Sequence, residues 1–128
     1  MKLSATRVLA SFAIAASLGA LAGPARAAVP EAKHGVLTGD NGMTLYTFDK
    51  DKADSGKSEC TGACAKNWPP FLASASESAS GDYGFVQRAD GKMQWAYKGK
   101  PLYFWHKDKK PGDKTGDGFK RVWHVARG

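Results

Sequence analysis

The chain has 128 residues, of which 42% are hydrophobic and 24% are charged, and its formal net charge is +7. These values are typical of one globular domain and exclude a disordered polyelectrolyte, which would hold too few apolar residues to build a core. The 15 glycines follow no three-residue period, which excludes a collagen-like chain. Composition alone does not indicate what the protein does.

The N-terminal segment, residues 1–27, has the pattern of a secretory signal peptide. Lys2 and Arg7 give it a positive start, and an apolar stretch too short and too weakly hydrophobic for a membrane helix follows. Small residues precede a cleavage point after Ala27. We therefore expect cleavage near Ala27 and a periplasmic or secreted product, residues 28–128. The alternative is an amphipathic N-terminal helix that stays attached.

Removal of this segment changes the charge balance. Cleavage removes Lys2, Arg7 and Arg26 but no acidic residue, so the net charge falls from +7 to +4. In residues 49–52 and 107–110 the remaining lysines alternate with aspartates, a pattern typical of solvated loops. Nucleic-acid binding would need a stripe of one sign, so we expect no nucleic-acid partner.

Short apolar runs between turn residues predict a series of β-strands, at 36–38, 43–48, 85–88, 93–97, 101–105 and 121–125. The Asn41-Gly42 pair indicates a hairpin between the first two runs, and residues 89–92 indicate a second hairpin. Pro101 cannot donate to a ladder, so it should start its strand or lie at a sheet edge. Residues 60–68 are expected to form a short helical turn near the cysteines. The fold class is therefore all-β or β-rich.

An internal repeat is the most informative feature of the sequence. Residues 44–51 align with residues 101–108, and both copies read Leu-Tyr-x-aromatic-x-Lys-Asp. Gly42 and Gly99 precede the two copies, and a Trp follows each after a loop. The sequence thus predicts a single domain of two related, hairpin-containing repeats, at about 35–70 and 85–127.

The repeat motif consists of a tyrosine, a second aromatic residue and an aspartate in each copy: Tyr46, Phe48 and Asp51, then Tyr103, Trp105 and Asp108. The two aromatic residues of a copy share one face of a strand, and the aspartate falls just beyond the strand end. There its carboxylate can accept hydrogen bonds from loop amides. We expect the aromatic residues to be buried; an exposed binding stripe is the alternative.

The two copies of this motif resemble a bacterial family of secreted or lipoprotein repeats known for a Yx(FWY)xxD motif and of unknown function. The resemblance covers nearly all of the chain after the signal peptide and extends to Trp68-Pro69-Pro70. Many members of that family look like lipoproteins, whereas no cysteine in this sequence stands where a lipid would be attached. The resemblance implies a location and an architecture, but no reaction.

The two cysteines, Cys60 and Cys64, are separated by three residues that include a glycine. In an oxidising compartment two cysteines of a small domain most often pair, and this spacer permits bridging, so we expect a structural disulfide. The alternative is a copper or thiol-redox site, with two thiolates and an imidazole of His106 or His124 as ligands. The sequence does not place either histidine near the sulfurs.

Motifs of known catalytic chemistry are absent, among them G-x-S-x-G, H-E-x-x-H and a phosphate-binding glycine loop. We therefore expect a non-catalytic exported binding or interaction module. It would have no cofactor and no transmembrane span, and its partner would be an unknown envelope protein or small ligand. The alternatives are a periplasmic copper-binding or thiol-redox protein that uses the cysteine pair and, third, an enzyme without a recognisable motif.

Overall fold

The computed structural model describes residues 29–128. The signal peptide predicted at residues 1–27 lies outside this part. Over the described residues, helices of sufficient length and apolar character to cross a membrane are absent.

The described part of the chain is rich in short strands and holds one α-helix. In chain order these elements are β1 (Glu31–Lys33), β2 (Val36–Thr38), β3 (Tyr46–Phe48), α1 (Ala63–Asn67), β4 (Tyr83–Gln87), β5 (Met93–Tyr97), β6 (Lys100–Pro101) and β7 (Trp123–Val125). The β-rich class and the short helix beside the cysteines are confirmed. Strand β1 was missed because its residues, Glu-Ala-Lys, are all exposed and carry no β signal.

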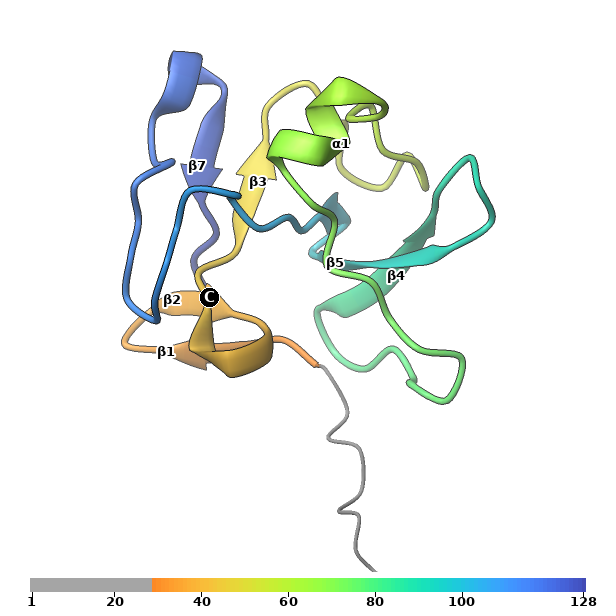
Figure 1. Cartoon of the computed structure of the whole chain (residues 1–128). Coiled ribbons are helices and arrows are strands. Elements are labelled where there is room, and N and C mark those ends of the chain that lie inside the picture. The colour runs from red at the N-terminus through yellow and green to blue at the C-terminus, as the bar shows by residue number, and fades with distance from the viewer. Residues whose placement is uncertain (1–28) are drawn as a thin grey trace, which may run out of the picture.

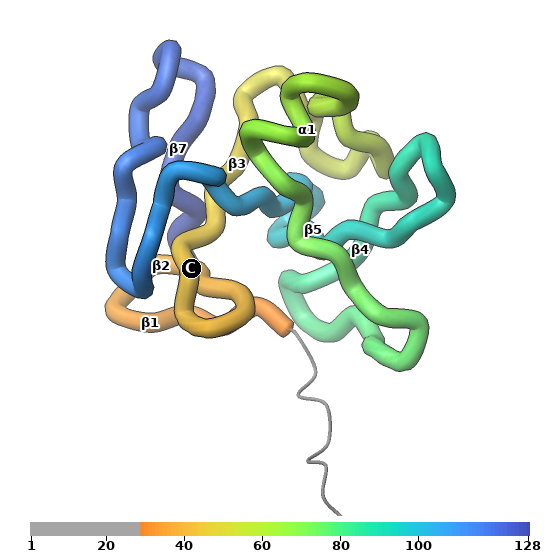
Figure 2. Tube along the Cα trace, in the orientation of Figure 1, coloured from red at the N-terminus to blue at the C-terminus, as the bar shows by residue number. Residues whose placement is uncertain are grey.

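The strands form three small antiparallel sheets, β1–β2, β3–β7 and β4–β5–β6. Figure 1 shows β3 and β7 side by side, although they come from opposite ends of the described chain. In their register Tyr46 lies opposite Val125 and Phe48 opposite Trp123. Figure 2 shows the C-terminus beside the β1–β2 hairpin, where Arg127 pairs with Val36. The last strand therefore joins parts of the molecule that are distant in sequence.

The first predicted hairpin forms, but its pairing is shorter than expected: the amide of Gly39 donates to Met43, and the amide of Leu45 donates to Leu37, both at 2.9 Å. Residues 43–48 were expected to pair with 36–38, and Thr44 and Leu45 do so; β2 also pairs with β1, whereas β3 pairs with β7. Asn41, with φ 59°, still reverses the chain in a 3-10 turn, and one bridge joins Thr38 to Thr44. Beyond that bridge the strand leaves β2, because its aromatic side chains are buried against β7.

The strands predicted later in the chain agree more closely with the structure. The hairpin around residues 89–92 is confirmed as β4–β5, and β6 follows as the edge strand that contains Pro101. The strand expected at 101–105 is shorter than predicted, and two isolated bridges at Tyr103, to Tyr46 and to Pro70, continue its pairing. Of the strand expected at 121–125, the first residue lies in a 3-10 turn, and β7 begins at Trp123.

Backbone hydrogen bonds relate the two repeats to each other by an approximate two-fold symmetry. The amide of Tyr46 donates to the carbonyl of Tyr103 (2.8 Å), and the amide of Tyr103 donates back to Tyr46 (3.0 Å). Leu45 accepts from Ala126 (2.8 Å), and in the same way the second repeat's Leu102 accepts from Phe71 (3.0 Å). Each motif strand therefore pairs with the final segment of the other repeat, and the halves form one interlocked unit.

The core consists of two clusters of buried residues. The first holds the motif aromatics and is formed by Val36, Tyr46, Phe48, Cys60, Trp68, Tyr103, Trp105, Trp123 and Val125. The second is formed by Leu37, Leu45, Phe71, Trp95, Leu102 and Ala126. Tyr46 and Tyr103 are fully buried, and Phe48 and Trp105 are 8% and 6% exposed. The predicted burial of the motif aromatics is confirmed, and they do not form an exposed stripe.

Candidate functional site

The tyrosine of each repeat bonds to the aspartate of the other. The hydroxyl of Tyr46 donates to Oδ2 of Asp108 at 2.7 Å, and the hydroxyl of Tyr103 donates to Oδ2 of Asp51 at 2.6 Å. Both bonds are buried and join residues more than fifty positions apart. The sequence pattern gave no sign of this exchange, because it shows each tyrosine beside its own aspartate.

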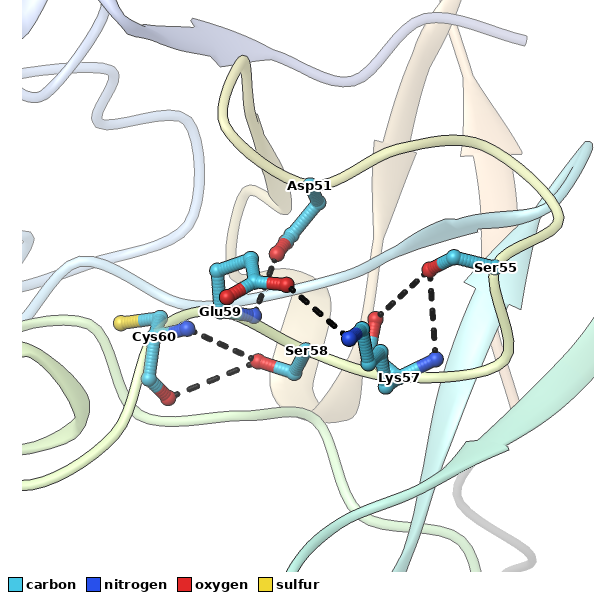
Figure 3. A network of polar contacts seen from close by, with 6 residues as sticks. All are labelled: Asp51, Ser55, Lys57, Ser58, Glu59 and Cys60. Atoms are coloured by element: carbon cyan, nitrogen blue, oxygen red, sulfur yellow. Dashed lines mark hydrogen bonds and ion pairs between the residues drawn. The ribbon is translucent and has the colours of Figure 1, made fainter.

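The other carboxylate oxygen of each aspartate accepts hydrogen bonds from the loop that follows that aspartate. Oδ1 of Asp51 accepts from the amide of Glu59 (2.6 Å), as Figure 3 shows. Oδ1 of Asp108 accepts from both the amide (2.9 Å) and the hydroxyl (2.6 Å) of Thr115. This is the loop-anchoring role expected for these two aspartates. Each one therefore links a loop of its own repeat to the tyrosine of the other.

Burial dominates the electrostatics of these pairs. Burial raises the pKa of Tyr46 and of Tyr103 far above the ordinary value, and the hydrogen bonds to the carboxylates raise it further. Burial also raises the pKa of Asp51, while the Tyr103 hydroxyl, the Glu59 amide and the charge of Lys100 act in the opposite direction. Both tyrosines are thus held as neutral donors, and neither is suited to act as a base near neutral pH.

A column of four stacked rings runs through the first core cluster. Trp68 and Trp123 lie at its centre, with centroids 3.8 Å apart and planes 1° from parallel. Phe48 stacks on Trp123 at 4.2 Å, and Trp105 stacks on Trp68 at 4.0 Å. The motif aromatic of each repeat therefore covers the tryptophan of the other. The sequence aligned Trp68 with Trp123 but could not show that they touch.

One polar network has no counterpart in the other repeat. The guanidinium of Arg88 donates to Gln94 Oε1 (2.7 Å), Ser58 Oγ (3.1 Å) and the Cys60 carbonyl (2.8 Å). Ser58 Oγ also lies 2.6 Å from the hydroxyl of Tyr103. On the symmetric side, Tyr46 instead accepts from a backbone amide, that of Gly116 at 3.2 Å. Sequence reasoning missed Arg88 and its partners, since nothing in the sequence marks a lone arginine as buried.

The sulfurs of Cys60 and Cys64 lie at disulfide distance, 2.00 Å apart, with Cα atoms 5.2 Å apart. Cys60 is fully buried and packs in the first core cluster, and Cys64 lies in α1. Ser58 Oγ accepts from the Cys60 amide at 3.1 Å, as drawn in Figure 3. The bridge fixes the turn that leads into Trp68.

The two histidines of the copper alternative lie at separate surface positions. His106 Nδ1 is 3.2 Å from the carbonyl of Asn67, and His124 Nε2 is 2.9 Å from Asp49 Oδ2. Across residues 29–128, clusters of three or more His, Cys, Asp or Glu side chains positioned to hold a metal ion are absent. The structure therefore does not gather Cys60, Cys64, His106 and His124 into one ligand set.

Fold and motif geometry together define a β-rich domain of two repeats that are locked by reciprocal tyrosine–aspartate bonds. The model of a family described as a secreted repeat of unknown function matches residues 29–71 and 84–127, and the chain belongs to this family. The two matched segments are the two interlocked repeats. No curated protein and no solved structure matches the chain.

Proposed function

We propose that this protein is a non-catalytic exported module that binds a small ligand or an envelope partner through its surface. One observation carries this proposal: the six motif residues are all buried in the core, and their tyrosine and aspartate side chains bond to one another. Residues that are buried and bonded to one another in this way stabilise the fold. The groups that meet a ligand must therefore lie on loops and hairpins outside the motif.

The same geometry argues against catalysis by the motif. A general acid or base must come within hydrogen-bond reach of a substrate. The hydroxyls of Tyr46 and Tyr103 belong to fully buried residues, and each already donates to a carboxylate 2.6–2.7 Å away. A substrate could reach these groups only by opening the core, so we propose that the protein is not an enzyme.

Export to the periplasm, with cleavage near Ala27, is part of this proposal. It rests on the N-terminal sequence pattern and agrees with the description of the family as secreted. N-terminal sequencing of protein purified from a periplasm-competent bacterial host should begin at or near Ala28. A product that retains Met1 would contradict it.

Binding without turnover is tested on the mature protein, residues 28–128. A ligand that binds only the folded state raises its melting temperature in a saturable way. We expect such a shift with at least one member of a panel of oligosaccharides, anions, peptides and divalent metals, and recovery of that ligand chemically unchanged. Conversion of the ligand would instead identify an enzyme. A panel with no saturable response would contradict the binding role.

A further inference from the structure

A groove of about 360 Å³ lies between the β1–β2 hairpin and the loop at residues 111–114. Its wall includes four basic residues, Lys33, His34, Lys114 and Arg127, together with Val36 and Pro111. This volume is within the range of small-molecule sites in proteins. We call this site the basic groove.

The local backbone explains how the basic residues come together. His34 and Gly35, with φ of 52° and 81°, form the two-residue turn between β1 and β2, and Lys33 precedes it. Arg127 is carried to the hairpin by its bridge to Val36. Lys114 lies in the loop that follows the second motif aspartate. Three segments far apart in sequence thus contribute positive charge to one groove.

The basic side chains that line the basic groove form no ion pair with the described residues. Its lining includes no aspartate or glutamate. The ion pairs found over residues 29–128 are Lys57–Glu59 and His124–Asp49, and neither touches the groove. Asp113, the nearest acid in the loop, instead accepts from the amides of Lys109 (2.8 Å) and Lys110 (3.2 Å).

The symmetry of the repeats supplies a reference for this groove. Gly42 precedes the first tyrosine by four residues and lies against Pro111, three residues after the second motif aspartate. At the corresponding places of the other half, Gly99 lies against Asp54. A second groove, of about 580 Å³, occurs there, and we call it the acidic groove.

Gly42 and Pro111 of the basic groove correspond to Gly99 and Asp54 of the acidic groove, whereas the other walls of the two grooves come from different positions. Asp54, Asp82 and Lys98 line the acidic groove, which gives it a net negative charge, whereas the basic groove carries only positive charge. The side chain that faces the glycine is a proline in one groove and an aspartate in the other. The concentration of positive charge in the basic groove is therefore not repeated in the second groove.

We propose that the basic groove binds a small ligand that carries two or more oxyanion charges, phosphate or carboxylate. This inference rests on the proposed binding function and assigns its site. The guanidinium of Arg127 can pair with two oxygens of one anionic group, and Lys33 and Lys114 act as point charges at its sides. Val36 and Pro111 contact an apolar part of the ligand.

Isothermal titration calorimetry of the mature protein at low salt tests the proposal, with inorganic pyrophosphate and succinate as the probes. We expect saturable one-to-one binding of at least one of them, weakened by added salt because the attraction is electrostatic. Comparison of the two probes shows whether phosphate or carboxylate chemistry is preferred. The triple variant Lys33→Gln, Lys114→Gln, Arg127→Gln should weaken binding at least about tenfold, a loss expected when charged partners are removed.

Lys98→Gln, in the acidic groove, is the matched control and should leave affinity unchanged. Melting temperatures of both variants show that they fold. Absence of saturable binding to either probe, unchanged binding in the triple variant, or an equal loss in Lys98→Gln would overturn the proposal. So would binding to anionic phospholipid vesicles without binding to either small anion. If both probes fail while another class of ligand binds elsewhere, the proposed function stands and this site alone is rejected.

Discussion

The two repeats are closely alike inside the core and different outside it. Inside, each tyrosine bonds to the other repeat's aspartate, and each motif aromatic stacks on the other repeat's tryptophan. Outside, the disulfide fixes the loop after Asp51, whereas the segment after Asp108 has no disulfide and instead places Phe119 against Trp68 and Trp105. Contacts that cross between repeats depend on both copies at once, which explains why the buried motif is the same in both.

The two tyrosine–aspartate pairs also differ in the other polar groups that surround them. Asp51 lies beside Lys100, and Tyr103 joins the network of Arg88 through Ser58. The Asp108 carboxylate accepts hydrogen bonds from Tyr46 and Thr115. The first repeat's loop is therefore tied to the second repeat's hairpin by charged groups that have no symmetric equivalent.

The largest effects should come from the ends of the ring column. Trp105→Ala and Phe48→Ala each remove a buried ring, so each should lower the free energy of unfolding by about 3–5 kcal/mol, the usual range for large core aromatics. Urea denaturation followed by tryptophan fluorescence and circular dichroism measures the loss. Met93→Ala, at a position 37% exposed, is the control and should cost much less. A near-neutral Trp105→Ala would mean that this ring is free to contact a ligand.

The reciprocal tyrosine–aspartate bonds can be weakened one at a time. Tyr46→Phe and Tyr103→Phe should each cost about 1.5–3 kcal/mol, the range for hydrogen bonds to charged groups. Tyr103→Phe should be the costlier change, because Asp51 keeps only the Glu59 amide while Asp108 keeps two bonds from Thr115. Urea denaturation of both variants beside Tyr97→Phe measures the difference. Equal costs would show that the number of hydrogen bonds left on each carboxylate does not decide the loss.

The disulfide should matter less than the large core aromatics. It closes a very short loop, and loop-closure entropy then predicts a stabilisation of about 2 kcal/mol. The double variant Cys60→Ser, Cys64→Ser should lose that amount in urea denaturation and still fold. Native protein should show no thiol that reacts with Ellman's reagent. A reactive thiol in the native protein would contradict the expected pairing.

Copper binding by the same cysteines is tested in a separate experiment. Anaerobic titration of the reduced protein with Cu(I) against a competing chelator should show no tight one-to-one complex. Cys60→Ser, His106→Ala and His124→Ala are the informative variants. Tight stoichiometric binding that is lost in Cys60→Ser and weakened by a histidine variant would make copper handling the better account of this protein.

The smallest effect concerns alkaline pH. Burial raises the pKa of Tyr46 and Tyr103 in the folded state, so the folded protein keeps two protons that the unfolded chain releases above about pH 10. Their contribution to stability is complete below that pH and falls as pH rises through it. Tyrosinate absorbance should show that neither ionises before unfolding. The variant Tyr46→Phe, Tyr103→Phe should therefore form as many tyrosinates as wild type before it unfolds; fewer would refute this assignment.

Much of the architecture follows from sequence because its causes are local. Alternation of apolar residues and turn glycines predicted β4–β5, and the eight-residue repeat predicted two equivalent halves. Burial of the motif aromatics follows from their shared strand face. The same reasoning failed for β3, which pairs with β7, since pairing with a distant segment leaves no mark on neighbouring residues.

What the sequence determined by itself is the set of repeated parts: two tyrosines, two aspartates and the aromatics beside them. Only the tertiary structure decided that these parts are exchanged between repeats, with Tyr46 bonded to Asp108 and Tyr103 to Asp51. Only the folded chain brings Lys33, Lys114 and Arg127 to one groove. The reason is physical: residue spacing fixes strands and turns, whereas the burial of large aromatic rings selects which distant strands meet.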